Sequence, residues 1–189
     1  MIYKDNKSNS ENTENQTTAQ TNQTITDLRM EIVSYDTINP LISNNRNVQE
    51  ITKLVFEPLL QLDENYKLQP CLATEWAKSG DTSYILKLRS NVKWQDGTSF
   101  TAQDVKYTIE TLKQINSIYS YNVQHIASVD IIDNYSIRIN LDTIIPFFEY
   151  NLIFPIVSST YFAGQDIQNT DKNATPIGTG MYKIESNST

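Results

Sequence analysis

The stretch Leu86–Asp104, which reads LKLRSNVKWQDGTSFTAQD, constrains the fold of this chain more than any other part of it. Over residues 84–89 large apolar side chains recur at every second position, which predicts a strand with one buried face. Asp96-Gly97 then predicts a tight turn, because glycine tolerates a positive φ and aspartate can hydrogen-bond to its own turn. The first half of the stretch therefore indicates a strand, a loop and a turn.

The second half of the stretch indicates a helix with a defined start. Thr101 is a favourable N-cap residue, and Asp104 lies three residues later, where a capping box has its second member. Apolar and small side chains then recur at helical spacing, so we expect the helix to run to about Gln114. The stretch holds no nucleophile, general base or metal cluster, so it predicts a scaffold rather than an active site.

Composition argues against several classes of function. The formal net charge is −7 and the isoelectric point is about 4.7, whereas a nucleic-acid partner requires a basic face. Cys71 is the only cysteine, so an intrachain disulfide is excluded and a small core residue is expected. His125 is the only histidine, so nothing indicates a histidine-rich metal site or a Ser/His/Asp catalytic set. We therefore expect no enzymatic activity, no cofactor, no metal and no nucleic-acid partner.

The N-terminal residues 1–26 are polar and low in complexity, which predicts a disordered tether or an ordinary frayed end. They contain no apolar core of a signal peptide, and no run of about 18 apolar residues occurs in the sequence. The alternation over Leu28–Val33 predicts a first strand.

Three further elements follow from local patterns. A helix is expected from Asn47, and two alternating runs around Asp133-Asn134-Tyr135 predict a hairpin. Pro146 suits the first turn of another helix, which Pro155 would end. The apolar faces of these elements predict a core that includes Trp76, Leu86, Leu88, Trp94, Ile109, Ile137, Ile139 and Phe147.

Several of these segments together resemble the extracellular solute-binding protein family 5, the peptide, dipeptide and nickel receptors of ABC importers. The similarity rests on the runs ATEW at 73–76, VKWQDGT at 92–98, FTAQDV at 100–105 and PIGTGMYKI at 176–184, and it extends over Thr26–Glu185. It implies an α+β fold with mixed sheets and packed helices. This would be the N-terminal part of a two-lobed, type II periplasmic-binding-protein-like fold whose second lobe is missing.

The resemblance also implies how the chain is divided. Residues 1–26 would be the tether, and residues 27–44 the first strand and cleft loop of lobe one. Residues 45–172 would form an additional α+β subdomain, and residues 173–189 a return strand into lobe one.

The same resemblance implies which residues face a ligand. The loop at 36–40 would lie at the mouth of the cleft, although a plain turn explains the same residues. The serine- and tyrosine-rich segment around Tyr119 and Tyr121 would bring one of these tyrosines to the cleft. The alternative is that the tyrosines only pack against other side chains. The implied wall consists of Asp36, Thr37, Asn39, Pro40, Tyr119 and Tyr121, and Gly178, Thr179 and Gly180 would lie near the hinge and allow a tight entry into a strand.

The function implied is the capture of short peptides outside a bacterial membrane and their delivery to the permease subunits of an ABC importer. The receptor would be a monomer, lipid-tethered in the parent protein. Another small solute, such as nickel, is open as the ligand. A different class of function is a non-transport peptide-sensing or interaction module, or a truncated remnant that binds nothing.

Overall fold

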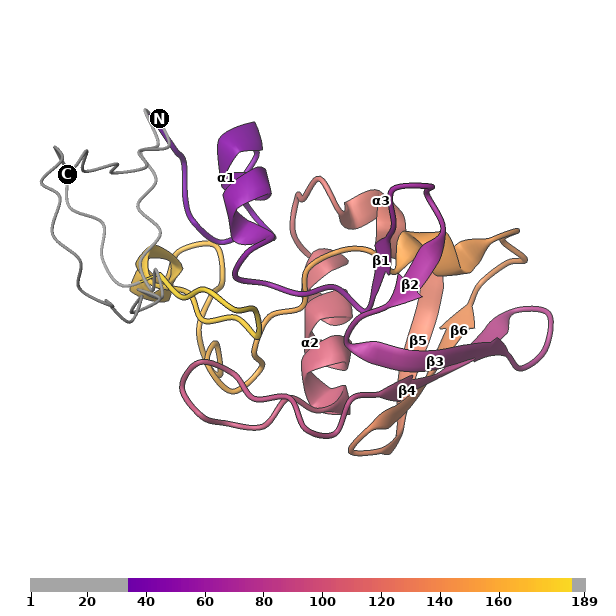
Figure 1. Ribbon diagram of the computed structural model, residues 1–189. Helices are drawn as coiled ribbons and strands as arrows, with labels where there is room; N and C mark the ends of the chain where they lie inside the picture. The colour runs from indigo at the N-terminus through magenta and orange to yellow at the C-terminus, as the bar shows by residue number, and fades with distance from the viewer. Residues whose placement is uncertain (1–33, 185–189) are drawn as a thin grey trace, which may run out of the picture. The chain divides into compact units, whose positions relative to one another are not determined.

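The computed structural model describes residues 34–184, and its centre is a four-stranded sheet in the order β3-β4-β6-β5 (Figure 1). Every neighbouring pair in this sheet is antiparallel. Contacts divide the chain into the units Met1–Ser34 and Tyr35–Thr189, and all described elements lie in the second unit. The sheet consists of β3 (Ala73–Lys78), β4 (Ser83–Leu88), β5 (Ile126–Asp133) and β6 (Ser136–Leu141).

The two central strands, β4 and β6, contribute much of the core, because every second side chain of each strand points to the same buried face of the sheet. In the antiparallel register Leu86 lies opposite Ile137 and Tyr84 lies opposite Ile139, and all four side chains are buried. Burying a large aliphatic side chain stabilises the fold by about 1.5–3 kcal/mol. The predicted strand over 84–89 and the predicted hairpin are confirmed.

Helix α2 (Ala102–Leu112) packs against β5 and begins and ends close to the predicted residues. Its buried face consists of the side chains at helical spacing, including Val105, Ile109 and Leu112. The Asp104 carboxylate accepts a hydrogen bond of 2.8 Å from the backbone N–H of Thr101, as the capping pattern predicts.

Asp104 also joins this helix to segments that are distant in the sequence. Its side chain is buried at 2% exposure, and Oδ2 accepts from Trp94 Nε1 at 3.3 Å. Oδ1 accepts from both the backbone N–H (2.8 Å) and the hydroxyl (2.7 Å) of Ser159. One turn later, the Thr108 hydroxyl accepts from the backbone N–H of Val157 at 3.1 Å. The packing of Thr101, Trp94 and Ser159 around the start of helix α2 therefore depends on one buried carboxylate that accepts from all three residues.

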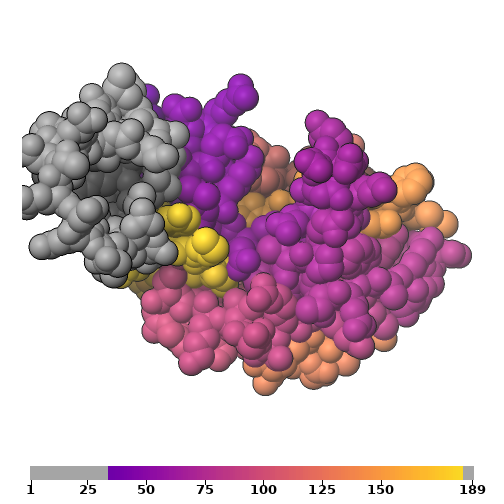
Figure 2. Space-filling model, in the orientation of Figure 1, coloured from indigo at the N-terminus to yellow at the C-terminus, as the bar shows by residue number. Residues whose placement is uncertain are grey.

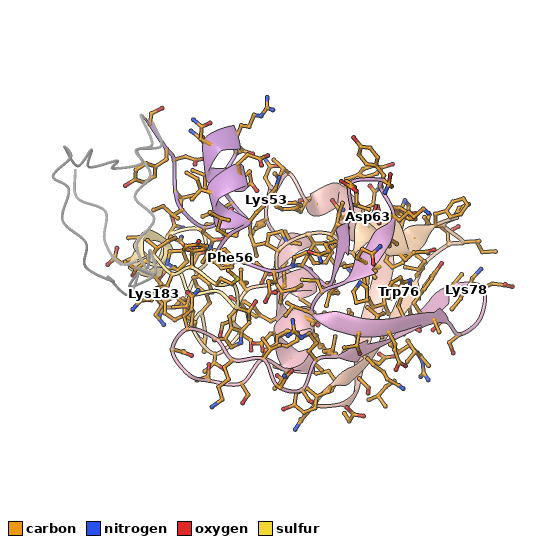
Figure 3. The ribbon with its side chains drawn as sticks, viewed as in Figure 1. Lys53, Phe56, Asp63, Trp76, Lys78 and Lys183 are labelled. Carbon is orange, nitrogen blue, oxygen red and sulfur yellow. The ribbon has the colours of Figure 1, made fainter. Side chains whose placement is uncertain are left out.

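Smaller elements surround the sheet. Helix α1 begins one residue before the expected start, because the Asn45 side chain accepts from the backbone N–H groups of Asn47 and Val48. A separate antiparallel pair, β1 and β2, forms a short hairpin whose turn holds Asp63 (Figure 3). The bounds of these elements are α1 Arg46–Thr52, β1 Leu60–Leu62, β2 Leu68–Pro70, α3 Ser120–Val123, η1 Phe148–Asn151 and η2 Asp171–Ala174.

One core prediction is wrong. Phe147 is 75% exposed and has a positive φ of 56°, and the expected helix after Pro146 is only the 3-10 turn η1. Phe148 takes the buried position instead, with its ring centroid 5.3 Å from that of Tyr84. A single short turn can direct only one of two consecutive aromatic side chains inward. Trp76 is half-buried, because it lies on the edge strand β3 (Figure 3).

The α+β class is confirmed, but the sheets of residues 34–184 are antiparallel throughout rather than mixed in strand direction. The predicted tether 1–26 and the strand Leu28–Val33 lie outside the described residues. Within the described part of the return segment, residues 176–184 form no strand. The boundaries at 27–44, 45–172 and 173–189 stay predictions. Among residues 34–184 there is no helix with the length and apolar character that a membrane span requires.

Candidate functional site

The loop that begins at Asp36 is fixed by hydrogen bonds within itself. The Asp36 carboxylate accepts from the Ser43 hydroxyl at 2.6 Å and from the backbone N–H groups of Asn44 at 2.7 Å and Thr37 at 2.8 Å. Burial alone would raise the pKa of Asp36, but these donors outweigh it and hold that pKa below its ordinary value. The Asp36 carboxylate therefore links the start of the loop to its end at Ser43 and Asn44.

Asn39 is fully buried and anchors the same loop to a distant segment. Its amide nitrogen donates to Asn173 Oδ1 at 2.8 Å, and its amide oxygen accepts from the backbone N–H of Leu41 at 3.0 Å. The Thr37 hydroxyl accepts from the backbone N–H of Asn39 at 3.2 Å. These hydrogen bonds stabilise the loop. Contact of Asp36, Thr37, Asn39 and Pro40 with a ligand stays a prediction.

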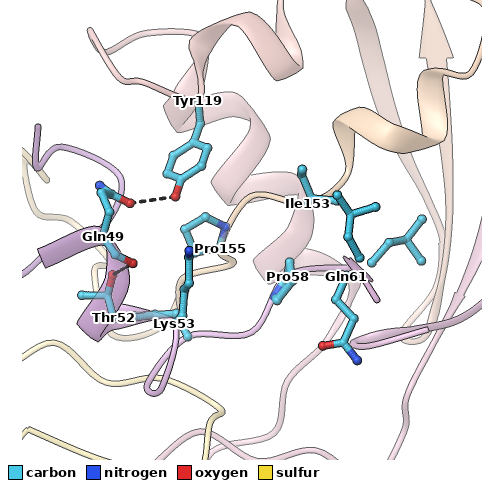
Figure 4. Close-up of a pocket in the computed structure, with 11 residues that line it drawn as sticks. Gln49, Thr52, Lys53, Pro58, Gln61, Tyr119, Ile153 and Pro155 are labelled. Carbon is cyan, nitrogen blue, oxygen red and sulfur yellow. Dashed lines mark hydrogen bonds between the residues drawn. The ribbon is translucent and has the colours of Figure 1, made fainter. Parts of the chain in front are cut away.

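Gln49, on helix α1, joins this loop to one of the two candidate tyrosines (Figure 4). Its amide nitrogen donates to the carbonyl oxygens of Pro40 (2.9 Å) and Ser43 (2.8 Å). Its amide oxygen accepts from the hydroxyl of Tyr119 at 2.7 Å. The structure thus brings Pro40 and Tyr119 together through a residue that the sequence patterns do not single out.

A cavity of about 360 Å³ lies beside this contact (Figure 4). Tyr119 lines it, whereas Tyr121 is 75% exposed and is not part of the lining. Exposed side chains such as Lys53 and Gln61 border the cavity, so it opens to solvent. Its polar lining consists of Gln49, Thr52, Lys53, Gln61 and Tyr119, and its apolar lining of Phe56, Pro58, Leu60, Leu62, Ile153 and Pro155.

The surroundings of the cavity shift the pKa of the Tyr119 hydroxyl upward. Burial, and to a smaller extent the negative charge of Glu50, raises the pKa of Tyr119. Glu50 in turn forms an exposed ion pair with Lys53 at 2.8 Å. A neutral phenol beside apolar walls can exchange hydrogen bonds with a polar group of a ligand whose apolar part contacts the walls.

The glycine-rich segment lies elsewhere in the fold, between the end of helix α1 and the loop that contains Gln95 (Figure 2). Gln95 exchanges two hydrogen bonds with Gly178, and the backbone N–H of Gly180 donates to the Val55 carbonyl oxygen at 2.8 Å. A Cβ at Gly178 would lie 1.8 Å from that oxygen. The expected tight entry into a strand at these glycines is wrong, because residues 176–184 form no strand, and Gly178 instead allows a close approach to the backbone of Val55.

Thr179 lies in the same segment, and its buried hydroxyl has no hydrogen-bond partner among the described residues. The assignment of Gly178, Thr179 and Gly180 to a hinge is not tested by these contacts and stays a prediction. Within residues 34–184 no group of three or more His, Cys, Asp or Glu side chains is arranged to hold a metal ion.

Cys71 is only half-buried, but its chemistry is that of an unreactive thiol. Burial raises the pKa of Cys71 to about 11, and the Glu57 carboxylate, 3.7 Å from the sulfur, adds to the shift. At about pH 8 the thiolate fraction falls roughly 100-fold below that of an unfolded chain, because a free cysteine has a pKa near ~8.5. Iodoacetamide should therefore label the native chain at least about 100-fold more slowly than the urea-unfolded chain. Equal labelling rates would contradict the assigned environment.

Comparison with known proteins gives this arrangement a context. Residues 67–189 match the model of the bacterial extracellular solute-binding proteins, family 5 Middle. The glutathione-binding protein GsiB of Shigella boydii is 29% identical over 155 residues, which are 80% of this chain and 30% of that protein. The chain thus spans about 30% of the length of the curated relatives it matches.

Solved structures of solute-binding proteins are also similar to this chain. NikZ from Campylobacter jejuni, in complex with Ni(L-His), superposes with a TM-score of 0.73 at 33% identity and covers 84% of this chain and 32% of its own. AppA from Bacillus subtilis, an oligopeptide-binding protein in complex with a nonapeptide, superposes with a TM-score of 0.68. It covers 78% of this chain and 31% of its own, and at 22% identity it supports the fold alone.

Proposed function

The chain belongs to family 5 of the bacterial extracellular solute-binding proteins, and on that premise we propose that it captures short peptides for the permease of an ABC importer. Proteins of this family are transport receptors rather than enzymes, and they work on the periplasmic or extracellular side of the membrane. We place this chain there as well, and we propose a lipid tether in the parent protein.

The observation that carries the proposal is the cavity beside Tyr119. It combines fixed polar groups at one end with the apolar side chains of Pro58, Leu60 and Ile153 at the other. A short peptide offers the matching pair of features, a backbone with N–H and C=O groups and side chains with apolar surface. Glutathione, which the relative GsiB is named for binding, is itself a tripeptide.

A second candidate ligand is a small metal chelate, because NikZ, at 33% identity, was solved with Ni(L-His). Such a chelate brings its own metal ligands, so it does not require a cluster of histidines and carboxylates in the protein. The apolar lining around Leu60 and Ile153 favours the peptide.

Titration of the ¹⁵N-labelled 189-residue chain with tri-alanine, glutathione and Ni(L-His) separates these ligands. We expect saturable chemical-shift changes with tri-alanine at a dissociation constant of about 1 mM, near −4 kcal/mol. The affinity is weak because an open wall with few polar contacts hardly offsets the freedom that a peptide loses. Saturable shifts with Ni(L-His) alone would replace the peptide by the chelate, and no shift with any of the three would reject the proposed function.

A further inference from the structure

The orientation of the Gln49 side chain is determined by its neighbours. Its amide nitrogen lies 2.9 Å from the carbonyl oxygen of Pro40 and 2.8 Å from that of Ser43. A carboxamide oxygen in that place would face two acceptors, so the NH₂ end must lie there, and both of its hydrogens are used. The amide oxygen is left to face Tyr119.

This orientation decides what Tyr119 can do. A phenol has a single hydrogen, and Tyr119 donates it to Gln49 Oε1 over 2.7 Å (Figure 4). Toward the cavity the Tyr119 oxygen therefore presents only lone pairs. A phenol with an ordinary pKa of about 10 keeps this hydrogen at neutral pH, and burial raises the pKa of Tyr119 further.

The hydroxyl of Thr52, which also lines the cavity, likewise donates its single hydrogen within the chain. Its Oγ1 donates to the carbonyl oxygen of Val48 at 2.8 Å, one helical turn earlier. The donors in the lining are the side chains of Lys53 and Gln61, both exposed, and Lys53 pairs with Glu50. The two half-buried or buried hydroxyls of the cavity are thus both acceptors.

We propose that Gln49 is a positioning residue that makes Tyr119 a hydrogen-bond acceptor, so that the cavity selects ligands presenting an N–H donor beside an apolar group. For a short peptide this donor is a backbone amide N–H. The inference rests on the proposed function for its ligand class, and it adds a rule of selection within that class.

The test compares tri-alanine with an analogue methylated at its peptide nitrogens, which keeps the carbonyl groups and loses the amide N–H donors. Shifts of the Tyr119 ring signals follow binding, and a Tyr119→Phe variant assigns those signals. For the wild-type chain we expect the methylated peptide to bind at least about 5-fold more weakly.

Two variants separate this role from a merely structural one. In Gln49→Leu the Tyr119 hydroxyl is free to donate to a ligand carbonyl, so the 5-fold preference should disappear. In Gln49→Glu, measured at acidic pH where the new carboxyl is protonated, its O–H can donate to the Pro40 or Ser43 carbonyl and its C=O can still accept from Tyr119, so the preference should remain. A structural role alone would change both variants alike.

A readout without ligand tests the arrangement itself. The two hydrogens of the Gln49 side-chain amide should exchange slowly with solvent, since both are donated to carbonyl groups. Fast exchange, or equal binding of the two peptides by the wild-type chain, overturns the proposal. Absence of any saturable shift overturns the proposed function, and the selection rule with it.

Discussion

Replacing Asp104 by alanine should lower the free energy of unfolding by about 3–5 kcal/mol. The change removes the acceptor of the Thr101, Trp94 and Ser159 donors, all of which meet at a side chain that is 2% exposed. Each buried donor left without a partner costs about 1–3 kcal/mol. Urea denaturation followed by far-UV circular dichroism would give the difference.

Asp96 provides the matched control for that experiment. It also accepts two hydrogen bonds from one partner, the backbone N–H (2.9 Å) and the hydroxyl (2.6 Å) of Thr98, but it is exposed. Water can replace an exposed acceptor, so Asp96→Ala should cost no more than about 1 kcal/mol. Similar losses for the Asp96 and Asp104 variants would show that the carboxylate network does not hold this corner together.

Gly178→Ala should cost about 3 kcal/mol and release the segment around it. The new Cβ would lie 1.8 Å from the Val55 carbonyl oxygen, which is backbone and cannot rotate away. The segment must therefore move, and its two hydrogen bonds with Gln95 are lost with it. Hydrogen exchange should become faster at Gly178 and Gly180, alongside the loss seen by denaturation.

Thr179→Val is the control in the same segment. It removes a buried hydroxyl that has no partner among the described residues and keeps the shape of the side chain. Its effect on the free energy of unfolding should be neutral or slightly stabilising. An alanine at position 178 that is tolerated as well as valine at 179 would refute the close packing described here.

The elements that the sequence predicts correctly depend on neighbours in the chain. The alternation around Leu86 and the cap at Thr101 act within a few residues, and both elements form as predicted. The cap pattern could not reveal that Asp104 also accepts from Ser159, because 55 residues separate the two. A tertiary contact of that kind leaves no periodic trace in the sequence.

Long-range contacts also explain which part of the candidate site the sequence could not predict. Tyr119 and the Pro40 loop were predicted from the resemblance, but the link through Gln49 joins residues 70 positions apart. Gln49 lies on a short helix among other polar residues, so no local pattern marks it. Phe147 was misplaced for a related reason, since the buried ring of Phe148 packs against Tyr84 on strand β4, a contact between residues that are distant in the sequence.

Paramagnetic relaxation enhancement tests most directly whether the cavity beside Gln49 and Tyr119 binds short peptides. A tri-alanine peptide that carries a nitroxide label would be added to the ¹⁵N-labelled chain, with the reduced label as reference. We predict broadening centred on Gln49, Tyr119 and Ile153, which border the cavity. Broadening centred on the turn between β5 and β6, which contacts the start of helix α2, or uniform weak broadening without a centre, would contradict the account.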